Sequence, residues 1–130
     1  MSYYFNKTLK NISFEDAIEK VTAELKKEGF GVLTEIDVKE TLKKKIDVEF
    51  RKYKILGACN PHFAHQALTS ENKIGVFLPC NVVVQENENG EIEVSAVDPI
   101  ASMQAAKNEE LRGLATEVQG KMKKIIANLN

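Results

Sequence analysis

The chain has 130 residues, of which 43% are hydrophobic and 28% charged, as in an ordinary soluble globular domain with a core of its own. Its 18 basic and 19 acidic residues leave a formal charge of −1, so no overall field attracts nucleic acid or an anionic membrane. It contains neither a signal-peptide-like start nor an apolar run of about 18 residues. We therefore expect one cytoplasmic domain over residues 1–130, with no nucleic-acid or membrane partner.

The first predicted elements are a strand and a helix. Residues 3–9 alternate weakly between polar and apolar side chains, which favours a strand. Ser13 with Asp16 three positions later is a variant capping box, and an amphipathic helix follows it. Gly29 is the expected C-terminal stop of this helix.

A second strand, a lysine-rich helix and a third strand follow. Residues 30–38 are rich in β-branched side chains and predict a strand. Asp37 and Glu40 form the start signal of a short helix with the sequence VKETLKKKI. Its lysines indicate either a solvated face or a binding patch. A third strand is expected from about residue 48 to residue 58.

The middle of the chain contains the clearest hairpin signal. Residues 74–78 predict a short apolar strand that ends at Pro79. Further along, the pair Asn89-Gly90 between residues 81–88 and 91–97 predicts a two-residue turn, in which 82 faces 97 and 84 faces 95. That register gathers the following residues on the core face: Asn81, Val83, Ile92, Val94, Ala96 and Asp98.

The C-terminal part predicts two helices. Asp98 is a good N-cap and Pro99 a good first residue for a helical turn that reaches Met103. A longer helix is expected over about residues 108–128. One apolar stripe runs along it, consisting of Leu111, Ala115, Val118, Met122, Ile125 and Leu129. The stripe either docks onto the sheet or forms the seam of a homodimer.

Together these elements predict an α+β fold, a single small domain with an antiparallel-rich mixed sheet and helices packed on it. Glycine-rich phosphate-binding motifs and the serine-hydrolase elbow are absent from the sequence. No cofactor can be assigned.

The segment ACNPH marks the first half of a candidate site. Asn60 is a favoured N-cap and Pro61 a favoured first helical residue, so Cys59 should end a strand just before a helix begins. The positive end of that helix favours a thiolate, suited to nucleophilic, redox or metal-binding chemistry. Alternatively, Cys59 is a small buried apolar residue.

The segment LPCN marks the second half. Pro79 indicates an edge or a bulge, so Cys80 and Asn81 should also lie at a strand discontinuity. We hypothesise that the two Cys-Asn pairs meet at one end of the sheet and form a small-ligand site together with Asp98.

A metal site is a further hypothesis. Its candidate ligands are Cys59, Cys80, His62 and His65. Their spacing differs from that of a zinc finger, whose two ligand pairs are each local. The histidines are three positions apart and share a helix face, and the simpler interpretation is that they are solvated there.

The sequence resembles the domain-of-unknown-function 302 family, in its cysteine-containing subgroup. The resemblance covers nearly the whole chain through the phrases GFGVLTEIDV, TLKKKI, YKILGACNPHFAHQAL, GVFLPCNVVVQE and VDP, in this order. It implies a small α+β domain with an antiparallel-rich sheet, able to form a homodimer, and it implies no activity. Cys59 and Cys80 match the subgroup, whereas His62 and His65 lie outside its motif. Many family members lack the cysteines, so the resemblance implies that the fold does not need them, and this favours a local chemical role for the two thiols.

Three functions remain open. The first is a module that binds a small molecule, a soft metal or a thiol around Cys59, Asn60, Cys80 and Asn81. The second is a thiol or redox enzyme, in which Cys59 attacks and Cys80 resolves. The third is a structural protein that dimerises through its last helix. Binding ranks first because no activating base can be placed beside Cys59. Whether the chain is an enzyme is left open.

Overall fold

Five strands form one sheet in the order β1-β5-β4-β3-β2. The structure is a computed structural model and describes residues 2–129. The strands are β1 (Tyr4–Leu9), β2 (Gly31–Asp37), β3 (Tyr53–Cys59), β4 (Cys80–Glu86) and β5 (Ile92–Val97). Every neighbouring pair is antiparallel. The predicted α+β class is therefore confirmed, with an antiparallel sheet in place of the expected mixed one.

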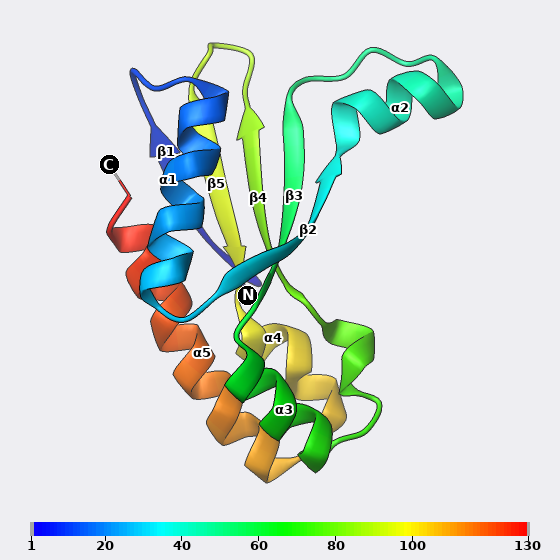
Figure 1. The fold of residues 1–130 in the computed structure, drawn as a ribbon, viewed down its shortest axis with the longest axis vertical. Helices are drawn as coiled ribbons and strands as arrows, with labels where there is room; N and C mark the ends of the chain where they lie inside the picture. The colour runs from blue at the N-terminus through cyan, green and yellow to red at the C-terminus, as the bar shows by residue number, and fades with distance from the viewer. Residues whose placement is uncertain (1, 130) are drawn as a thin grey trace.

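The helices lie along one side of the sheet and at both of its ends, with α2 at the end opposite α3 and α4 (Figure 1). They are α1 (Phe14–Lys27), α2 (Val38–Ile46), α3 (Pro61–Ser70), α4 (Pro99–Met103) and α5 (Glu109–Ala127), with short 3₁₀ turns η1 (Ile74–Phe77) and η2 (Gln104–Ala106). Helix α1 packs on β2 and β4, and α5 packs on β1 and β5. Helices α3 and α4 lie at one end of the sheet, against α5. Within residues 2–129, no helix has the length and hydropathy needed to cross a membrane.

The turn after α1 directs the chain back into the core. Gly29 has a φ of +86°, which suits a residue without a Cβ. Its N–H donates to the Lys26 carbonyl at 3.0 Å, and the N–H of Phe30 donates to the Leu25 carbonyl at 2.9 Å. This pair of bonds is the Schellman motif. It confirms the predicted stop at Gly29 and buries Phe30 next to the start of β2.

The predicted hairpin register is wrong by one residue. Val82 faces Ala96 and Val84 faces Val94, because the loop has three residues. The N–H of Gly90 donates to the Asn87 carbonyl at 3.0 Å, and Gly90 has a φ of +82°. This is a turn followed by a left-handed residue, the usual form of a three-residue hairpin.

The corrected register changes which side chains reach the core. Val82 and Val84 are buried, whereas Val83 is half-buried on the opposite face. Asn81 moves to that opposite face and is exposed. Because side chains alternate between the two faces of a sheet, a register shift of one residue places every side chain of β4 on the face opposite to the predicted one.

Two further strand predictions need correction. Residues 74–77 form the 3₁₀ turn η1, in which Ile74 is buried while Val76 is 80% exposed. A short apolar run does not distinguish a strand from a helical turn by periodicity. The third strand begins at Tyr53 rather than near residue 48.

The apolar stripe of α5 was expected either to dock onto the sheet or to form the seam of a homodimer. Its apolar stripe is buried against the sheet and against α3 and α4. Docking onto the sheet is therefore confirmed. The stripe residues that would have formed a homodimer seam are packed in the core of their own chain.

The buried side chains form two separate clusters. The larger lies between the sheet and the two helices α1 and α5. The smaller joins η1 to helices α3, α4 and α5 and consists of Ala67, Ile74, Met103, Leu111 and Ala115. The end of the sheet where β3 and β4 meet α3 lies between these clusters, and the candidate site forms there.

Candidate functional site

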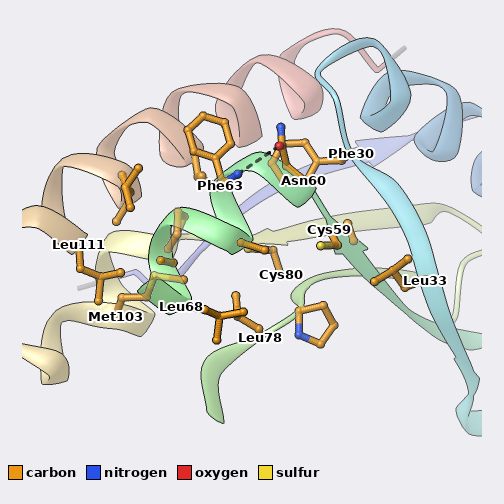
Figure 2. Close-up of a pocket in the computed structure, with 18 of the residues that line it drawn as sticks. Phe30, Leu33, Cys59, Asn60, Phe63, Leu68, Leu78, Cys80, Met103 and Leu111 are labelled. Carbon is orange, nitrogen blue, oxygen red and sulfur yellow. Dashed lines mark hydrogen bonds between the residues drawn. The ribbon is translucent and has the colours of Figure 1, made fainter. Parts of the chain in front are cut away.

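A cavity of about 320 Å³ lies where the two clusters meet, and we refer to it as the apolar pocket (Figure 2). Its walls come from β2, β3, the start of β4, and helices α3, α4 and α5. The lining residues are Phe30, Leu33, Thr34, Ala58, Cys59, Asn60, Phe63, Ala64, Ala67, Leu68, Leu78, Pro79, Cys80, Pro99, Met103, Leu111, Leu114, Ala115 and Val118. The pocket therefore contains three of the predicted site residues, Cys59, Asn60 and Cys80.

Asn60 connects β3 to α3 and fixes the entry to the pocket. It is the N-cap of α3, as predicted, and its Oδ1 accepts from the N–H of His62 at 3.2 Å and of Phe63 at 3.4 Å. Pro61 is the first residue of the helix. The cap orients α3 so that Phe63, Ala64 and Ala67 face the pocket.

The two cysteines approach the pocket from adjacent strands. Cys80 is the first residue of β4 and faces Ala58 of β3, and Cys59 is the next residue along β3. Cys80 is buried and Cys59 is half-buried, and both thiols are free. The structure thus places both sulfur-bearing side chains on the wall of the same cavity.

The strand discontinuity expected at Pro79 lies elsewhere. Pro79 precedes β4, after a cis peptide bond with Leu78. The irregularity in pairing occurs on the neighbouring edge strand, between Val32 and Thr34 of β2. Leu33 is the extra residue there, and its side chain lies at the pocket rim, 69% exposed.

The described side chains that line the pocket are uncharged. Among the described residues 2–129, none that lines it is charged, and its polar side chains are Thr34, Asn60 and the two cysteines. Burial, with a smaller contribution from the neighbouring Cys59, raises the pKa of the Cys80 thiol to about 11. Cys80 is therefore a neutral thiol at pH 7.

Asn81 and Asp98, the other two predicted site residues, lie outside the pocket lining. Asn81 faces the opposite side of the sheet, near Tyr53 and Val83. Asp98 caps α4 by accepting from the N–H of Ile100 at 3.0 Å, and it also accepts from Nε2 of Gln119 at 3.2 Å. Its role as a helix cap was predicted and is confirmed, but the structure does not bring it to the cysteines.

The histidines also lie outside the pocket. His62 and His65 are exposed on α3, and neither is among the lining residues. Within residues 2–129, no three His, Cys, Asp or Glu side chains lie close enough together to hold a metal ion. The four candidate metal ligands are therefore not assembled into one site.

Sequence reasoning missed most of the pocket wall. In Figure 2, Met103 of α4 and Leu111 of α5 lie across the pocket from the cysteines, although they come from a distant part of the chain. Leu114 of α5 also lines the pocket. The apolar stripe of α5 was visible in the sequence, but Leu114 is outside it. Nothing local indicates that these side chains would leave a space instead of closing on the sheet.

Fold and cavity together define the class of protein: a small α+β domain with an apolar pocket at the end of an antiparallel sheet. The chain belongs to the family described as "Domain of unknown function DUF302", which matches residues 5–129. A solved structure, described as that of the uncharacterized conserved protein DUF302 from Bacillus stearothermophilus, has 27% sequence identity and a TM-score of 0.89, over 98% of either chain. No curated protein matches the chain. The family resemblance predicted from the ACNP and LPCN segments is thus confirmed.

Proposed function

We propose that this protein binds a small, uncharged, mainly apolar molecule in the apolar pocket. The observation that carries the proposal is a cavity of about 320 Å³ whose described lining has no charged side chain. Binding sites for small molecules are usually concave and apolar, with a few polar groups. Thr34, Asn60 and the two thiols are the polar groups available here.

The size of the cavity limits the ligand. An engineered cavity of about 150 Å³ with a similar apolar lining accommodates benzene. By proportion, the apolar pocket would hold roughly twice as many non-hydrogen atoms, about twelve. The expected ligand therefore has one or two rings or a short branched chain.

A charged ligand is disfavoured by the same lining. An ion that enters a pocket without a compensating charge loses hydration worth several kcal/mol. Charged ligand groups would have to remain at the rim, near Leu33 and Leu68, where solvent is accessible.

A thiol enzyme has less support. A nucleophilic cysteine needs a nearby base or a lowered pKa. The described lining supplies no histidine or carboxylate, and the raised pKa keeps Cys80 protonated. Two free cysteines are consistent with the reducing cytoplasm that we propose as the location.

The proposal is tested by filling the pocket. Ala64 of α3 is half-buried and lines the pocket, so Ala64→Phe should occupy the space that a ligand needs. Ala23→Phe on the exposed side of α1 is the matched control. Ligand-observed NMR with naphthalene and with its charged analogue naphthoate measures binding. We expect naphthalene to bind the wild type and the control, and not Ala64→Phe. Equal binding of naphthoate, or no binding of naphthalene to the wild type, would contradict the proposal.

We also propose that two copies of the chain associate through α2 and the open face of the sheet. Helix α2 buries none of its residues and projects from the sheet (Figure 1), with Ile46 62% exposed. Ile36, Ile55 and Val83 form a row across three strands, and none of them is buried. Exposed apolar surfaces of this kind are typical of association sites, and a symmetric pair would let each α2 cover the other's row.

Measurement of mass in solution tests this second proposal. The double variant Ile36→Glu with Ile46→Glu should convert a dimer into a folded monomer. Val76→Glu removes an apolar side chain that is even more exposed, at 80%, from η1 and is the control. A wild type that is monomeric at all concentrations would contradict the association.

A further inference from the structure

We propose that Cys59 and Cys80 form a two-thiol site for a trivalent, thiophilic centre that carries one apolar group, such as a monosubstituted organic arsenic(III) compound. The inference rests on the proposed function, since the apolar group would occupy the apolar pocket. It adds a covalent step and a chemical class of ligand to that function.

The pairing of β3 with β4 places the two cysteines on neighbouring strands at the same end of the sheet. Cys80 is directly opposite Ala58, the residue before Cys59. Opposite Cα atoms are about 5 Å apart and successive ones about 3.4 Å apart along a strand, so the two cysteine Cα atoms should be roughly 6 Å apart. This Cα separation is within the range of joined cysteines. Because successive side chains of a strand alternate between faces, the register alone points Cys59 away from the face of Cys80, and the bridge requires the Cys59 side chain, at the last position of β3, to turn into the shared cavity. Both side chains also line the same cavity.

The neutral lining selects among thiophilic ligands. A monovalent metal between two thiolates leaves one net negative charge, and no described residue of the lining compensates it. Zinc requires four ligands, and residues 2–129 contain no cluster of even three candidate ligands. A trivalent centre with one organic group and two sulfur ligands is uncharged. The pocket therefore favours this product over a charged metal complex.

The reaction is a condensation without a change of oxidation state. Two S–H bonds and two As–O bonds of R–As(OH)₂ break, and two S–As bonds form. Each thiol proton leaves with one hydroxyl group as water, so two waters are released. Arsenic stays trivalent and no oxidant is needed. Because both thiols give up their protons to the leaving groups, the complex forms without a permanent thiolate in the pocket.

The space beside the sulfurs accommodates the organic group. Phe63, Leu78 and Met103 belong to the same lining as the cysteines (Figure 2). A phenyl ring is no larger than the benzene that a cavity of about 150 Å³ holds. Inorganic arsenite lacks such a group and would gain nothing from the apolar wall.

Phenylarsine oxide is the probe that tests the inference on the reduced full chain. Cys59 and Cys80 are the only cysteines, so the variants Cys59→Ser, Cys80→Ser and the double variant form a complete set. Native mass spectrometry follows the adduct during competition with glutathione. We expect one adduct on the wild type, at least about a hundredfold weaker retention in either single variant because the second bond is intramolecular, and none in the double variant. Circular dichroism verifies folding, and Cys80→Ala replaces Cys80→Ser if the serine variant does not fold.

The outcomes separate this inference from the proposed function. If naphthalene binds the wild type but both single variants retain phenylarsine oxide as well as the wild type does, the two-thiol site is overturned and the binding pocket stands. If the wild type retains phenylarsine oxide through both thiols but does not bind naphthalene, the general pocket fails instead. Equal retention of inorganic arsenite and phenylarsine oxide would overturn the role of the apolar group.

Discussion

Gly57 of β3 lies so close to Thr34 of β2 that a side chain at position 57 would overlap the Thr34 hydroxyl group. A Cβ built on Gly57 would also lie 2.7 Å from Cγ of Pro79. This close approach brings β2 and the segment before β4 together at the end of the sheet. Both segments contribute walls to the apolar pocket, so the glycine helps to define its shape.

The first prediction concerns this contact. Gly57→Ala should lower the free energy of unfolding by about 1–3 kcal/mol, the usual cost of forcing a methyl group into a filled space. Gly31→Ala is the matched control, because a Cβ at Gly31 of β2 would meet no atom within 4 Å. Urea denaturation of the two variants measures the difference. Equal stabilities would contradict the close packing at Gly57.

The second prediction concerns the cap of α3. Asn60→Ala removes the oxygen that accepts from His62 and Phe63, and it should cost about 1 kcal/mol of stability. Asn60→Ser retains an N-cap and should cost less. If the cap orients the pocket wall, naphthalene binding should weaken more in the alanine variant than in the serine variant. Thermal denaturation and ligand-observed NMR provide the two measurements.

The third prediction concerns stability at high pH. The pKa of Cys80 is about 11 in the folded state against an ordinary value of 9.0. The unfolded chain therefore loses this proton first as pH rises, and the folded state is disfavoured. Burial of the neutral Cys80 thiol therefore contributes to the free energy of unfolding in full below about pH 9. This contribution, on the order of 2 kcal/mol in total, is lost by about pH 11.

Denaturation at several pH values tests the loss. The wild type is compared with Cys80→Ala, which lacks this thiol and keeps every other titratable group. Between pH 8.5 and 11, the free energy of unfolding of the wild type should fall by about 2 kcal/mol more than that of the variant. Parallel pH profiles would show that burial does not raise the pKa of this thiol.

Local signals in the sequence were sufficient for the helix starts. Asp37, Asn60 and Asp98 each cap the helix that follows, because the capping bond involves residues two or three positions apart. The prediction of the hairpin register was wrong for a similarly specific reason. Asn89-Gly90 favours a two-residue turn, but Asn87 accepts from both Gly90 and Glu91 and closes a three-residue loop instead.

The site was only half visible because its parts come from distant segments. Cys59 and Cys80 lie at strand ends that the sequence places well, and the register brings both to one cavity. The register error assigned Asn81 to the wrong face. The apolar wall from Met103 and Leu111 depends on how α4 and α5 pack at the end of the sheet, and no local pattern specifies that packing.

The fourth prediction concerns α2. This helix has no buried residue, so its stability depends on local interactions such as the cap, in which Asp37 Oδ1 accepts from the Glu40 N–H at 3.0 Å. Asp37→Ala should increase amide hydrogen exchange in α2 and leave the global free energy of unfolding within about 0.5 kcal/mol of the wild type. Hydrogen exchange with mass spectrometry resolves the helix. A large global loss would show that α2 belongs to the core.

The fifth prediction concerns Met122, in the middle of the α5 stripe. Its side chain is 0% exposed, so Met122→Lys buries an unpaired charge and removes a core side chain, a loss of several kcal/mol. Thr116→Lys introduces the same charge on the exposed side of α5 and should change stability by less than about 0.5 kcal/mol. Circular dichroism and mass in solution separate two outcomes. Because the stripe packs on the chain's own sheet, Met122→Lys should unfold the protein, whereas a folded monomer released from a dimer would show that the stripe is an intermolecular seam.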